Sequence, residues 1–395
     1  MSAEEQLAFD IRALCEPTSD LANQAAWFCA TAPHRQGLYG KRNWGGQLHS
    51  LCSYQGKLKP SIAYFLVNVF TERGQRVLDP LAGVGTVPLE ARRQGRVGIA
   101  NDLSPLGACV CRAKLELFTD AEVEAALEDL AEAIDAGPSL SDLTELVDVD
   151  WGLNNTIRDY FHPETLRELL IARSWFLDRG NLSVADEVVR SSLLHILHGN
   201  RPYALSRRSH PVTPLAPTGP VEYKSVVAKL VERLVRISPA LHELSDPAGP
   251  SEVHGIDFRD LSLSEPVDAV ITSPPFAQSF RFWSMNWMRL WFVGWTTPDF
   301  AKRPAEFLEL QQRKSFDPYA EFSTKMAELL RPGGLLIMHL GETAKVDMAK
   351  EIVPKLAGDF DVCFVGRECV ADTESHGLTD KGATLAHWYV FASRR

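Results

Sequence analysis

The feature that most constrains this chain is residues 76–102, where two short β-type runs flank a glycine-containing turn and a short helix. The first run is RVLDPL (76–81) and the second is RVGIAND (96–102), and the helical stretch between them is stopped by Gly95. Strands that alternate with helices favour a mostly parallel sheet covered by helices on both faces. We therefore expect an α/β domain.

Five further β-type runs follow a long helical stretch. They span 251–257, 267–275, 334–341, 359–366 and 383–392, which gives seven predicted strands in total. Residues 120–250 show helical periodicity, interrupted by the proline-rich loop 210–220. These patterns predict a seven-stranded Rossmann-like sheet with a helical insertion.

Composition limits the class of protein. The chain of 395 residues is 45% hydrophobic and 23% charged, which is typical of a soluble globular protein. No apolar run is long enough to span a bilayer, and the first ten residues lack a hydrophobic signal core, so we expect a cytoplasmic protein with no membrane partner. The seven cysteines are odd in number and are expected to be reduced thiols. Neither they nor the histidines show a spacing that predicts a metal site.

The net charge of −10 opposes a nucleic-acid partner only until its distribution is considered. Residues 120–150 hold eleven acidic and no basic residues, so this segment alone carries more negative charge than the net charge of the whole chain. Residues 21–71 and 191–221 contain basic residues and no acidic ones. Local basic surfaces matter more than the total when phosphates are bound. A polar loop is therefore a hypothetical contact to DNA phosphates, with an ordinary surface loop as the alternative. Its candidate residues are Arg201, Arg207, Arg208 and His210.

The turn DPLAGVGT (79–86) follows a strand and opens a helix, and Asp102 ends the next strand 23 residues after Asp79. Glycines allow a sharp turn and a close approach to a ligand, and a carboxylate at the second strand suits the two hydroxyls of a ribose. Pro88 stands where a dinucleotide fingerprint needs a third glycine, and no phosphate-binding Walker loop is present. A nucleoside cofactor without a pyrophosphate, such as S-adenosylmethionine, therefore fits better. A plain tight turn is the alternative.

The same turn resembles the first motif of the amino-group DNA methyltransferases, commonly Asp-Pro-Phe-x-Gly-x-Gly-Thr, with Leu81 where Phe is usual. The resemblance implies a class I methyltransferase core that binds S-adenosylmethionine. Residues 49–67 and 255–261 resemble two further segments of the family, one closing over the methionine part and one preceding the catalytic loop. On this resemblance the cofactor-binding residues are Asp79, Pro80, Ala82, Gly83, Gly85, Thr86, Asp102, Asp257, Tyr54 and Lys57. For Asp257, which would meet the adenine amino group, a carboxylate that only caps a turn is the alternative.

The apolar run 267–272 is followed by Ser273, Pro274, Pro275 and Phe276. This tetrapeptide resembles the Ser-Pro-Pro-Tyr/Phe catalytic loop of the same family. An exocyclic amine of a base is a poor nucleophile because its lone pair is delocalised into the ring. Acceptors aimed at its hydrogens, here the Ser273 hydroxyl and the Pro274 carbonyl, would free that lone pair. Two prolines hold such a loop rigid, and Phe276 offers a flat face for a flipped base. A proline turn that closes a strand is the alternative.

Ser at the first loop position favours cytosine N4 in the resembled family, whereas adenine-N6 enzymes more often carry Asp or Asn. We expect a site-specific methyltransferase acting on double-stranded DNA. Adenine N6, an amino group of an RNA base, and a non-catalytic nucleic-acid-binding subunit are the alternatives. A bacterial modification or phage-defence role, with a partner subunit, is implied by the resemblance only. The expected organisation is an N-terminal extension (1–48), a cofactor-binding half (49–119), a helical insertion that is a candidate DNA-recognition region (120–250) and a catalytic half (251–395).

Four tryptophans, at positions 283, 287, 291 and 295, are spaced four residues apart. This spacing predicts one face of a single helix. We expect that face to pack in the core rather than to stack on bases.

Overall fold

The computed structural model of the chain describes residues 21–41, 44–54, 56–198, 204–206, 216–241, 249–277, 282–369 and 384–395. Its centre is a seven-stranded sheet with the strand order β3-β2-β1-β4-β5-β7-β6. The strands are β1 (Arg76–Asp79), β2 (Val97–Asn101), β3 (Glu252–His254), β4 (Val267–Thr272), β5 (Leu330–Thr343), β6 (Phe360–Cys369) and β7 (Thr384–Arg394). All seven coincide with runs predicted from the sequence.

The sheet is parallel from β3 to β5, and β7 is antiparallel to both of its neighbours, β5 and β6. The chain builds outward from β1 through β2 to β3, returns, and then builds outward on the other side from β4. The strand order therefore reverses between β1 and β4. The prediction of a seven-stranded, Rossmann-like α/β core is confirmed.

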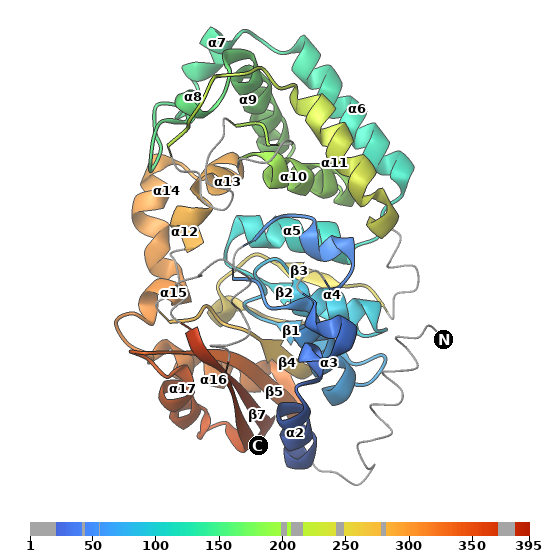
Figure 1. Cartoon of the computed structure of the whole chain (residues 1–395), viewed down its shortest axis with the longest axis vertical. Helices are drawn as coiled ribbons and strands as arrows, with labels where there is room; N and C mark the ends of the chain where they lie inside the picture. Colours follow the sequence, from blue (N-terminus) through green and yellow to red (C-terminus); the bar gives the residue numbers. More distant parts are fainter. Residues whose placement is uncertain are drawn as a thin grey trace.

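Helices cover both faces of the sheet because neighbouring residues of a strand point to opposite sides. Val77 of β1 packs into one core with α2, α3 and α4, whereas the adjacent Leu78 packs into another with α16 and α17. Figure 1 shows α3 and α4 beside the strands and α16 and α17 at the opposite side. These helices are α2 (Leu21–Thr31), α3 (Pro60–Phe70), α4 (Thr86–Arg93), α16 (Pro318–Leu329) and α17 (Met348–Leu356).

The helices that follow α5 (Pro105–Leu115) and precede β3 lie at one end of the molecule (Figure 1). Its helices are α6 (Asp120–Ala136), α7 (Leu140–Thr144), α8 (Ile157–Tyr160), α9 (Pro163–Asp178), α10 (Val184–Ile196) and α11 (Val226–Leu241). The acidic helix α6 begins at a capping box made by Thr119 and Glu122. Its buried residues recur every three or four positions, so its carboxylates lie on the opposite, outward face.

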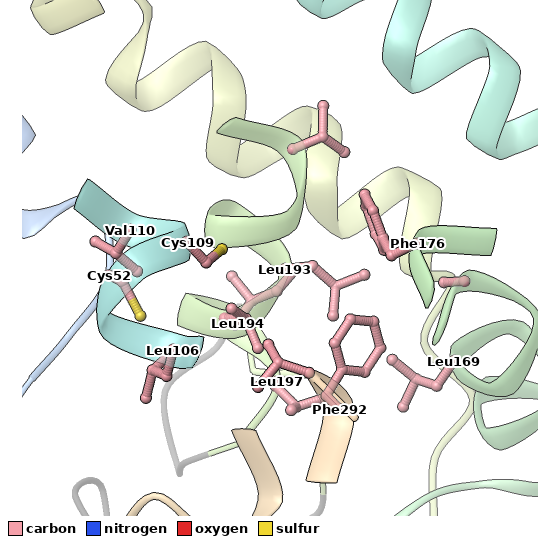
Figure 2. Packing of buried hydrophobic residues seen from close by; sticks show 14 of the residues in the cluster. Cys52, Leu106, Cys109, Val110, Leu169, Phe176, Leu193, Leu194, Leu197 and Phe292 are labelled. Atoms are coloured by element: carbon pink, nitrogen blue, oxygen red, sulfur yellow. The ribbon is translucent and has the colours of Figure 1, made fainter. Parts of the chain in front are cut away.

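This helical layer shares a core with the sheet domain. Figure 2 shows Leu193 and Leu194 of α10 between Cys109 of α5 and Phe176 of α9. Both leucines are fully buried, and burying one leucine side chain contributes about 1.5–3 kcal/mol. The layer is therefore packed against α5 rather than tethered to it.

Residues 282–311 form a cap of short helices: α12 (Phe282–Met285), α13 (Trp287–Phe292), α14 (Thr297–Lys302) and α15 (Leu308–Gln311). The tryptophans at 287, 291 and 295 are buried, as expected for a core. The prediction of one continuous helix is wrong, because Asn286 interrupts it and α13 ends at Phe292.

The remaining short elements are the 3-10 turns η1 (Pro33–Arg35), η2 (Gly37–Gly40), η3 (Gln47–Ser50), η4 (Phe258–Asp260) and η5 (Arg303–Glu306). Among the helices of the described ranges, none is both long and apolar enough to cross a membrane.

Candidate functional site

One cavity of about 570 Å³ collects residues of both sequence motifs. Asp79 ends β1, Asp102 follows β2, and Ser273 follows β4, so all three lie at the carboxyl ends of parallel strands. Because β1 and β4 are neighbours, the glycine turn and the Ser-Pro-Pro-Phe loop lie next to each other where the strand order reverses. Open α/β sheets bind their ligands at this position.

The turn between β1 and α4 depends on two glycines in the left-handed backbone region. Gly83 has a φ of 55° and Gly85 a φ of 74°, where a side chain would be strained. The turn is closed by a hydrogen bond of 2.8 Å from the Gly85 amide to the Ala82 carbonyl. Of the predicted turn residues, Asp79, Pro80, Ala82, Gly83 and Thr86 line the cavity. Gly85 instead lies against α5, where an added Cβ would be 2.9 Å from Cys111 Sγ.

Asp102 is held at the cavity by backbone amides. Its carboxylate oxygens accept hydrogen bonds from the Gly83 amide (2.7 Å) and the Ser104 amide (2.8 Å). Burial raises the pKa of Asp102 to about 6, and the two amides oppose that rise. Each oxygen keeps a further lone pair, so the carboxylate can still accept from two hydroxyl groups such as those of a ribose.

Three buried residues that were not predicted from the sequence support this half of the site. The Asn101 amide group donates to the Pro80 carbonyl (3.1 Å) and to the Ile256 carbonyl (3.1 Å), which joins the turns after β1 and β3. Lys114 is fully buried and donates to the Val84 carbonyl (2.6 Å), and burial lowers its pKa to about 7. A Cβ at Gly107 of α5 would lie 2.5 Å from the Gly83 carbonyl oxygen, so only glycine permits this close packing.

Asp79 connects the two motifs. It is buried, and its carboxylate accepts hydrogen bonds from the Thr272 hydroxyl (2.7 Å) and the Leu81 amide (3.2 Å). Burial raises the pKa of Asp79 to about 7. Because Thr272 directly precedes Ser273, this hydrogen bond fixes the Ser-Pro-Pro-Phe loop relative to the glycine turn.

Tyr54 and Lys57 lie on the segment that precedes α3, and both line the cavity. The Tyr54 ring lies over Gly83, with a would-be Cβ 3.5 Å from its edge, and packs against Phe282 of the cap at 5.6 Å. Burial and the nearby Asp102 raise the pKa of Tyr54, which keeps its hydroxyl protonated. The Lys57 ammonium donates to the His49 carbonyl (2.6 Å). The segment therefore closes one side of the cavity.

Asp257 has the geometry of the alternative weighed for it, and it also lines the cavity. Its carboxylate caps η4 by accepting from the Arg259 amide at 2.9 Å. The Arg259 guanidinium pairs with the same carboxylate at 3.0 Å. Asp257 therefore shapes the turn at the wall of the cavity.

The Ser-Pro-Pro-Phe loop is fixed by a contact at nearly every residue. The Ser273 hydroxyl lies 3.0 Å from Nδ1 of His339, and the Pro275 carbonyl accepts from the Gln312 amide (2.7 Å). The Ala277 amide donates to the Met348 sulfur at 3.2 Å. Within the described parts of the chain, no donor reaches the Pro274 carbonyl. That carbonyl and the Ser273 hydroxyl, which has one partner among the described residues, therefore keep hydrogen-bonding capacity.

Phe276 packs against the sheet. A Cβ at Gly341 would come 2.6 Å from the Phe276 ring, and the rings of His339 and His387 lie 5.4 Å and 5.6 Å away. Residues of β5 and β7 therefore hold the Phe276 ring in place, and the residue lines the cavity.

A second, open groove of about 1230 Å³ adjoins the cavity, and Ala277 and Thr343 line both. Its basic residues are Arg313, Lys314, Lys345, Lys350 and Lys355, and its acidic residues are Asp317, Glu342, Asp347 and Glu351. Three of these acids are already engaged: Glu342 by Arg367, Asp317 by Lys355, and Asp347 as the cap of α17. Lys314, Lys345 and Lys350 are exposed and form no ion pair with any described residue. The groove therefore offers unpaired positive charge beside the loop.

The predicted phosphate-binding residues Arg201, Arg207, Arg208 and His210 lie outside the described residues. Within the described ranges, no three His, Cys, Asp or Glu side chains are grouped so that they could hold a metal ion.

No family model matches the chain, and no curated protein matches it in sequence. Among solved structures, it is similar to TrmN from Thermus thermophilus, with a TM-score of 0.32 and 12% identity over 89% of this chain and 53% of that one. It is also similar to the rRNA methyltransferase AviRa from Streptomyces viridochromogenes, with a TM-score of 0.34 and 14% identity over 87% of this chain and 88% of that one. The chain thus spans about half the length of TrmN. The fold assignment itself depends on the strand order and directions described above.

Proposed function

We propose that this chain is an S-adenosylmethionine-dependent methyltransferase acting on the exocyclic amino group of a nucleic-acid base. The glycine turn and Asp102 support the choice of cofactor, because the turn admits a ligand against its backbone and the carboxylate can accept from ribose hydroxyls. Tyr54 and Lys57 would hold the methionine part. When bound, S-adenosylmethionine supplies an electrophilic methyl group, so that a nitrogen–carbon bond forms as the carbon–sulfur bond breaks and the nitrogen loses a proton to solvent.

The observation that carries the proposal is the state of the catalytic loop. Ser273 and Pro274 line the same cavity as Asp102, and the loop is held rigid by its contacts to Gln312 and Met348. A rigid pair of acceptors can accept hydrogen bonds from both N–H groups of an amino group. These bonds localise the nitrogen lone pair without reorganisation during the reaction. Proximity to the methyl donor then supplies much of the rate. No covalent intermediate on the protein is needed.

We further propose cytosine N4 in double-stranded DNA as the target. Ser273 at the first loop position supports cytosine, and the buried face of Phe276 supports a base turned out of the duplex and stacked on the ring. The lysines of the adjoining groove support a phosphate backbone passing beside the loop. Methylation of adenine N6, or of an amino group of an RNA base, would change the proposed target but not the proposed reaction at an amino group.

The experiment measures transfer of labelled methyl groups from S-adenosylmethionine to mixed-sequence duplex DNA and, in parallel, to structured RNA. We expect label in DNA, loss of transfer in Ser273→Ala with cofactor binding retained, and loss of cofactor binding in Asp102→Ala. Label only in RNA would overturn the DNA assignment. Cofactor binding that survives Asp102→Ala unchanged would contradict the proposed cofactor site.

The groove has a separate test in DNA affinity. The double variant Lys345→Ala/Lys350→Ala should bind duplex DNA more weakly and lower the salt dependence of binding by a slope of about 2, because each phosphate contact contributes about one. Lys325→Ala is the matched control, since Lys325 lies on α16 outside the groove and pairs with Glu328. An equal effect of the control would show that only overall charge matters.

A further inference from the structure

We infer that His339 is a positioning residue that fixes the Ser273 hydroxyl as a hydrogen-bond acceptor. The site would thereby select a base that carries an amino group over one that carries a carbonyl oxygen at the same ring position. This inference deepens the proposed function and rests on it. In the proposed reaction, Ser273 must accept a hydrogen bond from the amino group of the substrate. A serine hydroxyl can equally donate, so something must direct its own hydrogen elsewhere.

The geometry places one nitrogen in position to do this. Nδ1 of His339 lies 3.0 Å from Ser273 Oγ, and within the described residues it is the only hydrogen-bond partner of that hydroxyl. His339 lies on β5, is 4% exposed, and its ring packs between Phe276 and Tyr389, with centroids at 5.4 Å and 5.1 Å. A ring held on two sides cannot easily turn its Nδ1 away from the loop.

The ring is neutral at pH 7. Burial, together with the nearby His387 and His34, holds the pKa of His339 well below its ordinary value. A neutral imidazole carries one N–H and one acceptor nitrogen, whereas an imidazolium has only donors. A neutral ring has one acceptor nitrogen, and the proposed arrangement gives that role to Nδ1, which faces Ser273, and places the ring proton on Nε2.

The two tautomers give opposite sites. With the proton on Nε2, the Ser273 hydroxyl donates to Nδ1 and turns its lone pairs to the cavity, where they accept from an amino group. With the proton on Nδ1, His339 would donate to Ser273 and occupy one of its lone pairs, and the hydroxyl hydrogen would then be available to a carbonyl oxygen of the substrate. The first arrangement places an amino-bearing base beside the loop and rejects uracil or thymine, which carry an oxygen at the corresponding ring position. Leaving a polar group of the site unpaired is a strong ground for rejection.

The tautomer can be measured without any substrate. Long-range proton–nitrogen spectra of protein carrying 15N-labelled histidine, at pH 7, should show His339 neutral with its proton on Nε2, with His339→Asn identifying the signal by its loss. A proton on Nδ1, or a charged ring, would overturn the inference. This result does not depend on whether the chain transfers methyl groups, so failure of the inference and failure of the proposed function are distinguishable.

The kinetic test is a double-mutant cycle on the base that the transfer assay identifies. His339→Phe should lower kcat about tenfold with the KM for S-adenosylmethionine unchanged, and should lower it less than twofold further in a Ser273→Ala background. His339→Asn, which keeps an acceptor oxygen near the Nδ1 position, should recover part of the loss. Tyr389→Phe is the matched control, because it changes a buried neighbour of His339 whose hydroxyl pairs with Glu368 instead of the loop. Additive losses at Ser273 and His339 would show that His339 does not act through Ser273.

Discussion

A single methyl group added at Gly107 should separate the stability of α5 from cofactor binding. Alanine is normally favoured over glycine in a helix by about 0.8–1.0 kcal/mol, so propensity alone predicts that Gly107→Ala stabilises the protein. The structure predicts otherwise. The new Cβ would lie 2.5 Å from the Gly83 carbonyl oxygen and 2.9 Å from Asp102 Oδ1, closer than real Cβ contacts.

Neither neighbour of Gly107 can easily move away. The Gly83 amide is bonded to Asp102 at 2.7 Å, so both groups must shift together, or α5 must retreat from the turn. Overpacking of this kind costs about 1–3 kcal/mol, which outweighs the gain in propensity. We expect a net destabilisation of about 0–2 kcal/mol and at least a tenfold loss of S-adenosylmethionine affinity, equivalent to about 1.4 kcal/mol.

Urea denaturation would measure the stability term, and titration calorimetry with S-adenosylmethionine would measure the affinity. Gly358→Ala is the matched control, because its Cβ would meet nothing within 4 Å and its φ lies outside the left-handed region. A Gly107→Ala variant that is more stable than the unaltered chain and binds the cofactor equally well would contradict the expected clash with the Gly83 carbonyl.

Three further predictions follow from single contacts. Thr272→Val removes the hydroxyl donor of the buried Asp79 and should lower stability by about 1–3 kcal/mol in thermal denaturation, and an unchanged Tm would contradict the bridge between the motifs. Gln312→Leu releases the Pro275 carbonyl and should lower kcat while leaving cofactor affinity intact; equal losses in both would instead indicate general disruption of the site. Folding lowers the pKa of Lys114 from 10.5 to about 7, so between these pH values the unfolded chain binds one more proton than the folded chain. The free energy of unfolding should therefore rise by about 1 kcal/mol per pH unit from pH 7.5 to 9.5, relative to Lys114→Met. Parallel stability curves for the two proteins would show that Lys114 is charged in the fold.

The sheet was predictable because each strand is a short apolar run bounded by turn residues, and both determinants are local. The ends of α6 were also predictable, because its capping box and its apolar spacing depend only on residues close together in the sequence. The tryptophan stripe shows where local reasoning fails. Its spacing continues through Asn286, yet the Asn286 side-chain amide bonds to the Phe282 carbonyl at 3.1 Å and the backbone there leaves the helical region.

The chemistry-bearing residues were predictable only where they belong to motifs. Asp102 and Ser273 end strands next to recognisable turns, so the sequence carries their position. Gln312 gives no comparable signal, because its value lies in reaching the Pro275 carbonyl across the fold. His339 had one usable signal: it is a titratable residue in the apolar run LLIMHLG, where a buried polar group needs a partner. Which partner it has depends on the pairing of strands, which spacing does not give.

Identification of the methylated nucleoside would test the proposed chemistry of the Ser-Pro-Pro-Phe loop. The chain would be incubated with S-adenosylmethionine and duplex DNA, the DNA digested to nucleosides, and the products separated by mass spectrometry beside those of Ser273→Ala. We predict N4-methylcytosine from the unaltered chain and only a trace from the variant. A nucleoside methylated on carbon or oxygen, or an N-methylated product formed equally well by Ser273→Ala, would contradict the proposed function.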